Sequence, residues 1–315
     1  MRNARDISTP NKASALRALL AQPGAAIAIG AHDALSARLA EEAGFPVVWA
    51  SSFTVAAAQR AMPDMNLLTM TENLDAARYM NDAVGVPVIA DCDNGYGNAL
   101  NVIRTVEEYE RAGIAGISVE DNVFPKRSSL YTNIRRELAP AEEHVGKIRA
   151  AKRAQRNPDF VVIARTEALI AGYGVPEALA RARAYAQAGA DMILLHHKGP
   201  TADEVFDFMR RWDLATPIVV VPTLYPSVRV QDLEAAGVKL VIVANHLLRA
   251  AVKAMREALS ALAGAHSIEA AAPHVVPLED IFQLVELAKF RAREAEFVQN
   301  GPGAASPDRP RGGAA

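Results

Sequence analysis

Several features that would identify a partner or a compartment are scarce in this sequence. Its 315 residues include a single cysteine, Cys92, which excludes an intramolecular disulfide framework and a cysteine-rich zinc site. No apolar run approaches the ~20 residues that a transmembrane helix needs. The formal charge of −2 provides no basic field for nucleic acid and no polybasic segment for a membrane surface. We therefore expect a small-molecule substrate, with neither nucleic acid nor a membrane as a partner.

The two ends of the chain also lack structural signals. The first residues, MRNARDISTPNKAS, have no apolar segment of the secretory kind, so we expect a cytoplasmic protein. The last stretch, GPGAASPDRPRGGAA, cannot bury itself, so we expect residues 301–315 to form a disordered tail. We expect residues 1–12 to be flexible and residues 13–300 to form a single domain.

A unit of helix and strand repeats along the chain. Helical patterns end in Ala-Gly at Gly44, Gly113, Gly189 and Gly237, and an apolar strand follows each of them. Glycine suits the left-handed residue that ends a helix, so helix and strand alternate. The pattern gives eight strands, at residues 26–31, 47–52, 87–93, 115–121, 160–166, 191–197, 217–223 and 240–246.

Eight such units in about 250 residues predict an α/β fold, the (β/α)8 TIM-type barrel. An open, doubly wound sheet is the alternative, but no GxGxxG motif follows any strand. Two stretches lie outside the count. Residues 53–70 are long for a link between strand and helix, and we interpret them as a lid. Residues 277–299 form an extra amphipathic helix, for which we expect a contact with another subunit.

Polar residues follow nearly every predicted strand, at the end that becomes the mouth of a barrel. They are His32, Asp33, Ser51, Ser52, Asp91, Asp93, Glu120, Asp121, Arg165, Glu167, His196, His197, Thr223, Asn245 and His246. Strand interiors are almost wholly apolar, so this distribution is not random. We interpret Asn245 and His246 as supporting or packing groups.

The densest acidic group lies in residues 86–98, VPVIADCDNGYGN. Side chains alternate along a strand, so Asp91 and Asp93 are expected on one side of the strand end and Cys92 in the barrel wall. Two acids there form a hard oxygen site of the kind that Mg²⁺ takes. The alternative is that one Asp caps the next helix and the other is solvated. Glu120, on the neighbouring strand, is a third candidate carboxylate.

Basic and histidine side chains at the same mouth suit an anionic ligand. Arg165 has the planar fork that binds phosphate or carboxylate, although it could simply pair with Glu167. His196 and His197 are each either ligand-binding residues or satisfied core histidines. The loop at 122–130, NVFPKRSSL, is either a basic flap that closes over an anion or an ordinary surface loop.

Four stretches together resemble the phosphoenolpyruvate mutase and isocitrate lyase superfamily. They are DCDNGYGN, the ED-x-x-x-PK-x-x-S pattern that begins at Glu120, VVIARTEALIAGYG and ILLHHK. The likeness extends from about Ala26 to the carboxyl-terminal helix. It is closest to the branch of phosphoenolpyruvate mutase and phosphonopyruvate hydrolase, which shares the FPK loop, the EA-x-IAG stretch and the ANH ending of the eighth strand.

The resemblance implies three groups of site residues. The Mg²⁺ group is Asp91 as ligand, with Asp93, Glu120 and also Asp64 in its water shell. The substrate-binding group is Ser51, Ser52, Phe53 and Ser129. The catalytic group is Asp64, Lys126, Ser128, Arg165 and His196, of which Arg165 and His196 would grip a phosphoryl group. The resemblance also implies a homodimer or homotetramer in which the carboxyl-terminal helix is swapped between barrels.

The implied activity is the Mg²⁺-dependent interconversion of phosphoenolpyruvate and phosphonopyruvate, a phosphomutase reaction of phosphonate biosynthesis. Two positions depart from the mutase loop pattern, because Asn122 replaces a Lys and Ser128 replaces an Asn. Hydrolase relatives carry a Thr at the position of Ser128, so phosphonopyruvate hydrolysis to pyruvate and phosphate is the alternative. A carbon–carbon lyase of the usual type is disfavoured, since it places a catalytic Cys there. A non-catalytic metabolite-binding barrel would show neither turnover nor Mg²⁺ dependence.

The loop difference generates a first prediction. Ser128→Asn is expected to favour the mutase product over the hydrolysis product, because the hydroxyl that would position a water is removed. Phosphorus NMR with phosphonopyruvate and Mg²⁺ measures the ratio of phosphoenolpyruvate to inorganic phosphate. An unchanged ratio would show that this loop residue does not control water.

Overall fold

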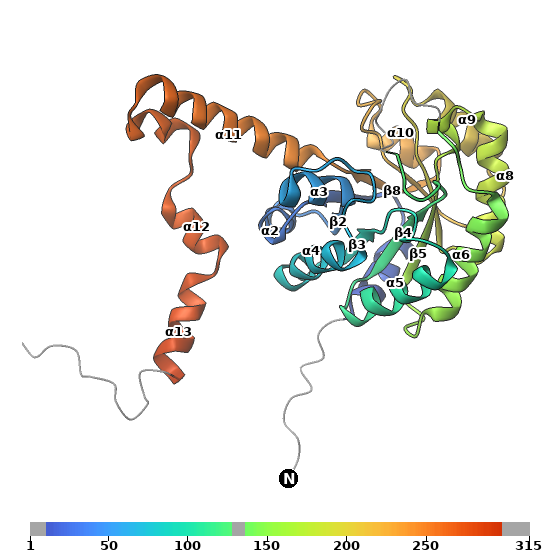
Figure 1. Cartoon of the computed structure of the whole chain (residues 1–315), viewed down its shortest axis with the longest axis horizontal. Helices are drawn as coiled ribbons and strands as arrows, with labels where there is room; N and C mark the ends of the chain where they lie inside the picture. Colours follow the sequence, from blue (N-terminus) through green and yellow to red (C-terminus); the bar gives the residue numbers. More distant parts are fainter. Residues whose placement is uncertain (1–10, 128–135, 298–315) are drawn as a thin grey trace, which may run out of the picture. The chain divides into compact units, whose positions relative to one another are not determined.

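Eight parallel strands close into a barrel in sequential order, with β8 beside β1 (Figure 1). The computed structural model describes residues 11–127 and 136–297. The strands are β1 Ala26–Ala31, β2 Val47–Ala50, β3 Val88–Asp91, β4 Gly116–Glu120, β5 Val161–Thr166, β6 Met192–Leu195, β7 Ile218–Val220 and β8 Val238–Val243. The predicted TIM-type barrel is therefore confirmed.

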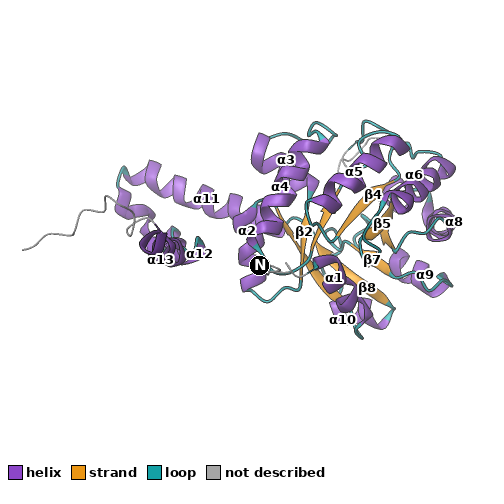
Figure 2. Ribbon diagram, turned by 90° about the horizontal axis from the view of Figure 1, so that it is seen from below, coloured by secondary structure: helices purple, strands orange, loops and turns teal. Residues whose placement is uncertain are grey.

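The helices that connect one strand to the next lie around the outside of the barrel (Figure 2). The bounds of all helices are as follows. Those of the first part of the chain are α1 Lys12–Ala21, α2 Ala34–Glu42, α3 Ser52–Arg60, α4 Met70–Ala83, α5 Ala99–Arg111, α6 Ala141–Ala154, α7 Ala168–Ala171, α8 Gly174–Gln187, α9 Asp203–Arg211 and α10 Val230–Ala235. The remainder are α11 His246–Ala265, the 3₁₀ helix η1 Ile268–His274, α12 Leu278–Leu284 and α13 Leu287–Phe297.

Strands buried on both faces explain why their sequences are apolar throughout rather than alternating. One layer of buried side chains lies between the strands and the surrounding helices, and Val48, Ile117 and Val162 belong to it. A second layer fills the barrel interior and includes Trp49 and Ile163. Fully burying each side chain of this size stabilises the fold by about 1.5–3 kcal/mol. The interior is thus a packed core, and ligands have room only at its ends.

One end of the barrel is closed by α1. Leu16 of this helix is fully buried and packs in the same cluster as the barrel interior. The ammonium of Lys12 donates to the backbone carbonyls of Asn81 and Val84, which ties α1 to the end of α4. Closure between β1 and β8 also requires a glycine, because a Cβ at Gly30 would lie 1.8 Å from the carbonyl oxygen of Ala244. These contacts leave the carboxyl ends of the strands as the open mouth.

The predicted alternation of Asp91 and Asp93 is wrong in its local structure. β3 ends at Asp91, and Asp93 has a φ of 50°, which belongs to the left-handed region. The chain turns here because the N–H of Gly95 donates to the carbonyl of Cys92 at 2.9 Å. Cys92 is fully buried, as expected for a residue of the barrel wall.

The interpretation of residues 53–70 as a loop is also wrong in part. Residues Ser52–Arg60 form α3, and only residues 61–69 connect it to α4. Ser51 caps the helix by accepting a hydrogen bond from the N–H of Thr54 at 3.5 Å. Three consecutive alanines, which have the best helix propensity, then favour its continuation.

The chain divides into two compact units, Met1–Ala251 and Val252–Ala315. The barrel lies in the first unit, and α11 continues into the second. The predicted single helix at 277–299 is instead two helices, α12 and α13, since Glu286 between them has a φ of 53°. No helix within residues 11–127 and 136–297 is long and apolar enough to cross a bilayer.

Candidate active site at the carboxyl ends of the strands

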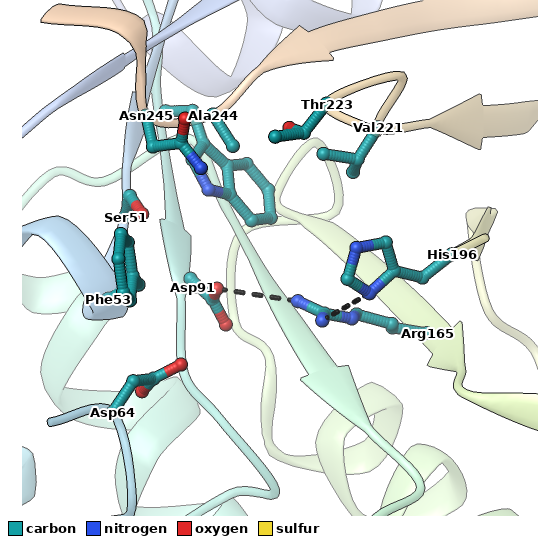
Figure 3. Close-up of a pocket in the computed structure, with 11 residues that line it drawn as sticks. Ser51, Phe53, Asp64, Asp91, Arg165, His196, Val221, Thr223, Ala244 and Asn245 are labelled. Atoms are coloured by element: carbon teal, nitrogen blue, oxygen red, sulfur yellow. Dashed lines mark hydrogen bonds and ion pairs between the residues drawn. The ribbon is translucent and has the colours of Figure 1, made fainter. Parts of the chain in front are cut away.

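A cavity opens at the mouth of the barrel (Figure 3). Its lining comes from six strands or the residues that follow them, and from α3 and the segment after it. The lining residues are Trp49, Ser51, Phe53, Asp64, Asp91, Arg165, His196, Val221, Thr223, Ala244 and Asn245. Six of the residues predicted for metal, substrate or catalysis are therefore brought together: Ser51, Phe53, Asp64, Asp91, Arg165 and His196.

Lys126 lies buried beside this cavity in the centre of an acidic cluster. Its ammonium is 2.8 Å from a carboxylate oxygen of Asp64 and 3.7 Å from one of Glu120, and it donates a short hydrogen bond to Asp93. Burial disfavours the charged amine, but the carboxylates outweigh burial and raise the pKa of Lys126 well above its usual range. The side chain therefore remains a cation and joins the segment after α3 to the ends of β3 and β4.

Arg165 is the second buried cation. Its guanidinium is 2.6 Å from Glu167, 3.3 Å from Glu120 and 3.5 Å from Asp91. Burial again opposes the charge, and the three carboxylates raise the pKa of Arg165 above its usual value. The pairing with Glu167 that the sequence left open is thus present, and the same guanidinium also lines the cavity.

His196 shares one ring nitrogen between two neighbours of opposite character. Its Nδ1 is 2.7 Å from Arg165 Nη2 and 2.8 Å from Glu167 Oε1. A guanidinium only donates and a carboxylate only accepts, so Nδ1 either accepts from Arg165 or donates to Glu167. Burial and the adjacent Arg165 lower the pKa of His196, which favours the neutral ring. The choice at Nδ1 then decides whether Nε2 is a donor or an acceptor.

The site holds more negative than positive charge. Ion pairs connect five carboxylates, those of Asp64, Asp91, Asp93, Glu120 and Glu167, with the two cations Lys126 and Arg165. Arg136 adds a third positive charge that interacts with Glu167 and Glu120. Burial raises the pKa of Asp91 to about 6 and that of Asp64 to about 7. A divalent cation would supply the missing positive charge that protons otherwise provide.

The donor set fits Mg²⁺ better than a metal bound only by side chains. Within residues 11–127 and 136–297, no three or more His, Cys, Asp or Glu residues form a group that could hold a metal ion directly. Mg²⁺ commonly takes one or two carboxylates and keeps several waters. Asp91 faces the cavity and suits that role. Glu120 Oε2 is buried and lies 3.3 Å from Arg165 Nε, but it accepts no hydrogen bond from the described residues. The roles of Asp91, Asp93 and Glu120 toward Mg²⁺ remain predictions.

Only part of the predicted loop at 122–130 lies among the described residues. Asn122 donates from its amide to Glu120 Oε1 at 2.9 Å, so it orients a carboxylate of the cluster. Lys126 is placed as described above. Ser128 and Ser129 lie outside the described residues.

Of the other residues predicted at the strand ends, Ser52 and Asn245 lie at or beside the cavity, whereas His197 has a structural contact elsewhere. Ser52 is buried at the first turn of α3, next to the cavity-lining Ser51 and Phe53. His197, by contrast, lies 3.3 Å from Glu204 and accepts a hydrogen bond from the N–H of Gly199, so it supports the turn after β6. His196 is therefore the histidine of the cavity. Asn245 reaches the cavity lining as well.

Asn66 is a connecting residue that sequence reasoning missed. Its side-chain oxygen accepts from the N–H of Lys126 at 2.6 Å and from Asn94 at 3.2 Å, while its nitrogen donates to Asp93 at 3.0 Å. It has a φ of 56°, a conformation that Asn tolerates better than most residues. In the sequence, the Asn at the end of Met62-Pro63-Asp64-Met65-Asn66 is a residue type that favours such a turn, and this was the only indication of its role.

Comparisons with known proteins agree with this geometry. The family model described as phosphoenolpyruvate phosphomutase matches residues 16–263. The chain is 44% identical over 292 residues to a phosphonopyruvate hydrolase of Variovorax sp. strain Pal2, covering 91% of this chain and 99% of the relative.

Solved structures give the same two names. A crystal structure of phosphoenolpyruvate phosphomutase from Streptomyces platensis subsp. rosaceus has a TM-score of 0.89 and 49% identity, covering 91% of this chain and 99% of that one. A phosphonopyruvate hydrolase in complex with oxalate and Mg²⁺ has a TM-score of 0.86 and 42% identity, covering 91% and 99%. The comparisons therefore contain both a mutase and a hydrolase.

The raised carboxylate pKa values generate a prediction for cation binding. A cation competes with the protons on Asp91 and Asp64, whose pKa values are about 6 and about 7, so affinity should fall as these groups protonate. Between about pH 7 and about pH 5, Mn²⁺ used as a probe for Mg²⁺ should bind about tenfold more weakly, as measured by electron paramagnetic resonance.

Two variants complete this experiment. Asp91→Asn should weaken binding and reduce its pH dependence, whereas Asp75→Asn, at an exposed position on α4 that pairs with Arg78, should behave like the unmodified protein. An affinity that stays constant down to about pH 5 would contradict the assignment, because it would place the cation on carboxylates with ordinary pKa values.

Proposed function

Since the chain belongs to the phosphoenolpyruvate phosphomutase family, within the phosphoenolpyruvate mutase and isocitrate lyase superfamily, we propose that it interconverts phosphoenolpyruvate and 3-phosphonopyruvate with Mg²⁺. One observation carries the proposal. Arg165 and His196 lie together on one side of the cavity, and the guanidinium also contacts Asp91 (Figure 3). A phosphoryl group and an enolate oxygen can thus be bound side by side.

The phosphoryl group is assigned to Arg165 and His196. The guanidinium donates from Nε to Glu167 at 2.6 Å, which fixes its orientation. It therefore needs little reorganisation to donate charge-assisted hydrogen bonds to phosphoryl oxygens. A phosphoryl oxygen of the dianion only accepts, and His196 serves it best when Nε2 carries the ring proton.

The carboxylate of the substrate is assigned to the first turn of α3. This helix has nine residues, and its first turn contains Ser52 and Phe53, after the N-cap Ser51, whose own N–H donates to the carbonyl of Ala31 at 3.3 Å. Ser51 and Phe53 line the cavity, and the positive end of the helix dipole favours a negative charge at that point. The substrate would then lie between α3 and the Arg165–His196 pair.

In the proposed reaction the bond between phosphorus and the enol oxygen breaks, which leaves the enolate of pyruvate. Carbon three of that enolate then forms the new bond to phosphorus, and no proton is gained or lost. Bound Mg²⁺ would supply Lewis-acid stabilisation of the enolate oxygen. Arg165 and His196 hold the phosphoryl group in place between the two steps, so catalysis is mainly positioning and charge stabilisation. Lys126 is assigned to neutralising Asp64 and Asp93 beside the reacting groups.

Hydrolysis of phosphonopyruvate is the second candidate, because Ser128 and Asn122 depart from the mutase loop pattern. In that reaction the oxygen of a water bonds to phosphorus and the carbon–phosphorus bond breaks, which leaves the enolate of pyruvate. A proton that the water releases ends on carbon three, and the products are pyruvate and phosphate. Asp64 is close enough to Lys126 and the cavity to orient such a water. The two candidates therefore differ in whether water reaches the phosphoryl group.

The test is phosphorus NMR of the purified protein with phosphonopyruvate and Mg²⁺. A phosphoenolpyruvate signal is expected from the mutase, whereas inorganic phosphate alone would overturn the mutase and support the hydrolase. Asp91→Ala should abolish either product, and Asp75→Ala on the exposed face of α4 should not. If the unmodified protein forms neither product and binds no Mg²⁺, the barrel is a non-catalytic scaffold.

We also propose that a second copy of the chain covers the apolar side chains of the second unit, which gives a homodimer or homotetramer. Large apolar residues there are exposed, among them Leu259, Ile268, Leu278, Phe282, Val285, Phe290 and Phe297. Large apolar side chains that gather in one exposed unit are typical of protein–protein interaction surfaces.

Light scattering coupled to size-exclusion chromatography tests this assembly. Leu278→Glu with Phe290→Glu should reduce the mass to that of one chain, because two charges would be buried without partners. Leu100→Glu, at a 73% exposed position on α5, is the matched control and should leave the mass unchanged. A single-chain mass for the unmodified protein would overturn the proposal.

A further inference from the structure

Asp121 is a buried carboxylate behind the site to which the proposed reaction assigns no role. It follows the last residue of β4 and has no exposed surface. Its Oδ1 accepts from the N–H of Glu167 at 2.8 Å. Its Oδ2 accepts from Thr166 Oγ1 at 3.1 Å, from Tyr185 at 2.7 Å and from Arg181 Nη1 at 3.2 Å. One side chain thus joins the end of β5 to α8.

The backbone of Asp121 makes a second set of connections. Its N–H donates to the carbonyl of Arg165 at 3.1 Å, and its carbonyl accepts from the N–H of Ala139 at 2.8 Å. Arg181 Nη1 also donates to the carbonyl of Ala139 at 2.9 Å. Asn122 and Leu138 form an antiparallel bridge next to these bonds. The chain that leaves β4 and the chain that enters α6 are therefore pinned at one point.

These bonds fix the backbone that carries Arg165 and Glu167. The side chain of Glu167 has no exposed surface, and its Oε1 contacts both Arg165 Nε and His196 Nδ1. If Glu167 moved toward Nδ1, that nitrogen would hold the ring proton, and Nε2 would become an acceptor that repels a phosphoryl oxygen. A small displacement of Glu167 would thus change the character of His196.

We propose that Asp121 is a positioning residue that acts with Tyr185 and Arg181 to place Glu167, so that Arg165 and His196 present donors to the phosphoryl group. The inference rests on the proposed function for the identity of that group. A role in stability alone explains the cluster less well, because a buried ion pair often stabilises a fold no more than apolar side chains of equal volume. The geometry instead directs two of the four bonds of the carboxylate to Thr166 and Glu167 at the end of β5, and the other two to Tyr185 and Arg181 of α8.

Tyr185→Phe is the mildest test. It removes the hydroxyl, which donates to Asp121 and accepts from Arg181 Nη1 at 3.2 Å, and it retains the ring, which makes an edge contact with His144 at 4.5 Å between centroids. Tyr225→Phe is the matched control, because Tyr225 is fully buried and its hydroxyl has no hydrogen-bond partner among the described residues. Asp121→Asn is the stronger variant, since it keeps the shape and removes the charge opposite Arg181.

The expected result is a fall in kcat of about tenfold for Tyr185→Phe and about a hundredfold for Asp121→Asn, with KM changed far less. Arg165→Ala removes the guanidinium assigned to the phosphoryl group, so its loss of kcat sets the upper limit for these variants. Mg²⁺-dependent binding of oxalate, which resembles the enolate end and lacks a phosphoryl group, should stay unchanged in both variants. Equal losses of oxalate binding and kcat, or an unchanged kcat, would overturn the proposal.

Nitrogen NMR of the histidine rings gives a readout that needs no turnover. The chain has seven histidines, and His196→Gln identifies the signals of His196. Tyr185→Phe should shift the His196 nitrogens toward the other tautomer, and Tyr225→Phe should not. If the unmodified protein is inactive on phosphonopyruvate, the proposed function fails while this shift still supports the positioning role. Unchanged His196 signals in an active protein would overturn the positioning role alone.

Discussion

Two buried cations, Lys126 and Arg165, hold together a site in which five carboxylates from four separate segments converge. Without them the acids that follow β3, β4 and β5 would repel one another in a low-dielectric interior. With them, the carboxylates still outnumber the cations, and the divalent cation proposed at Asp91 would balance that excess of negative charge. The arrangement of loops at the mouth of the barrel is therefore a consequence of charge compensation as much as of packing.

Much of the fold was predictable because the helix–glycine–strand repeat is local and physically simple. Strand termini were less predictable, since the turn at Asp93 depends on a hydrogen bond between Gly95 and Cys92 and on a left-handed φ. The length of residues 53–70 predicts a loop, whereas Ser51 followed by three alanines favours the helix α3 that the structure contains. The break at Glu286 has no comparable signal in the sequence.

In the site, as in the fold, features set by neighbouring residues were predictable, and features set by residues distant in the chain were not. Residues at strand ends could be identified because a barrel brings such ends together, and Asp91, Arg165 and His196 are examples. Asn66 and Asp121 could not be assigned their roles, since each acts through partners up to 64 residues away in the chain. Sequence patterns identify the groups that face a ligand more readily than the groups that hold them in place.

The pinning of Asp121 to Ala139 has a consequence for how such enzymes diverge. A connection whose two ends are fixed to the same point is a module that can be exchanged, because closure entropy grows only slowly with length. Replacing residues between the two anchors would change Asn122 and Lys126, which contact the acidic cluster, and would leave the order of the eight strands unchanged. Grafting this segment between family members of different activity is accordingly a natural route by which one scaffold acquires new chemistry.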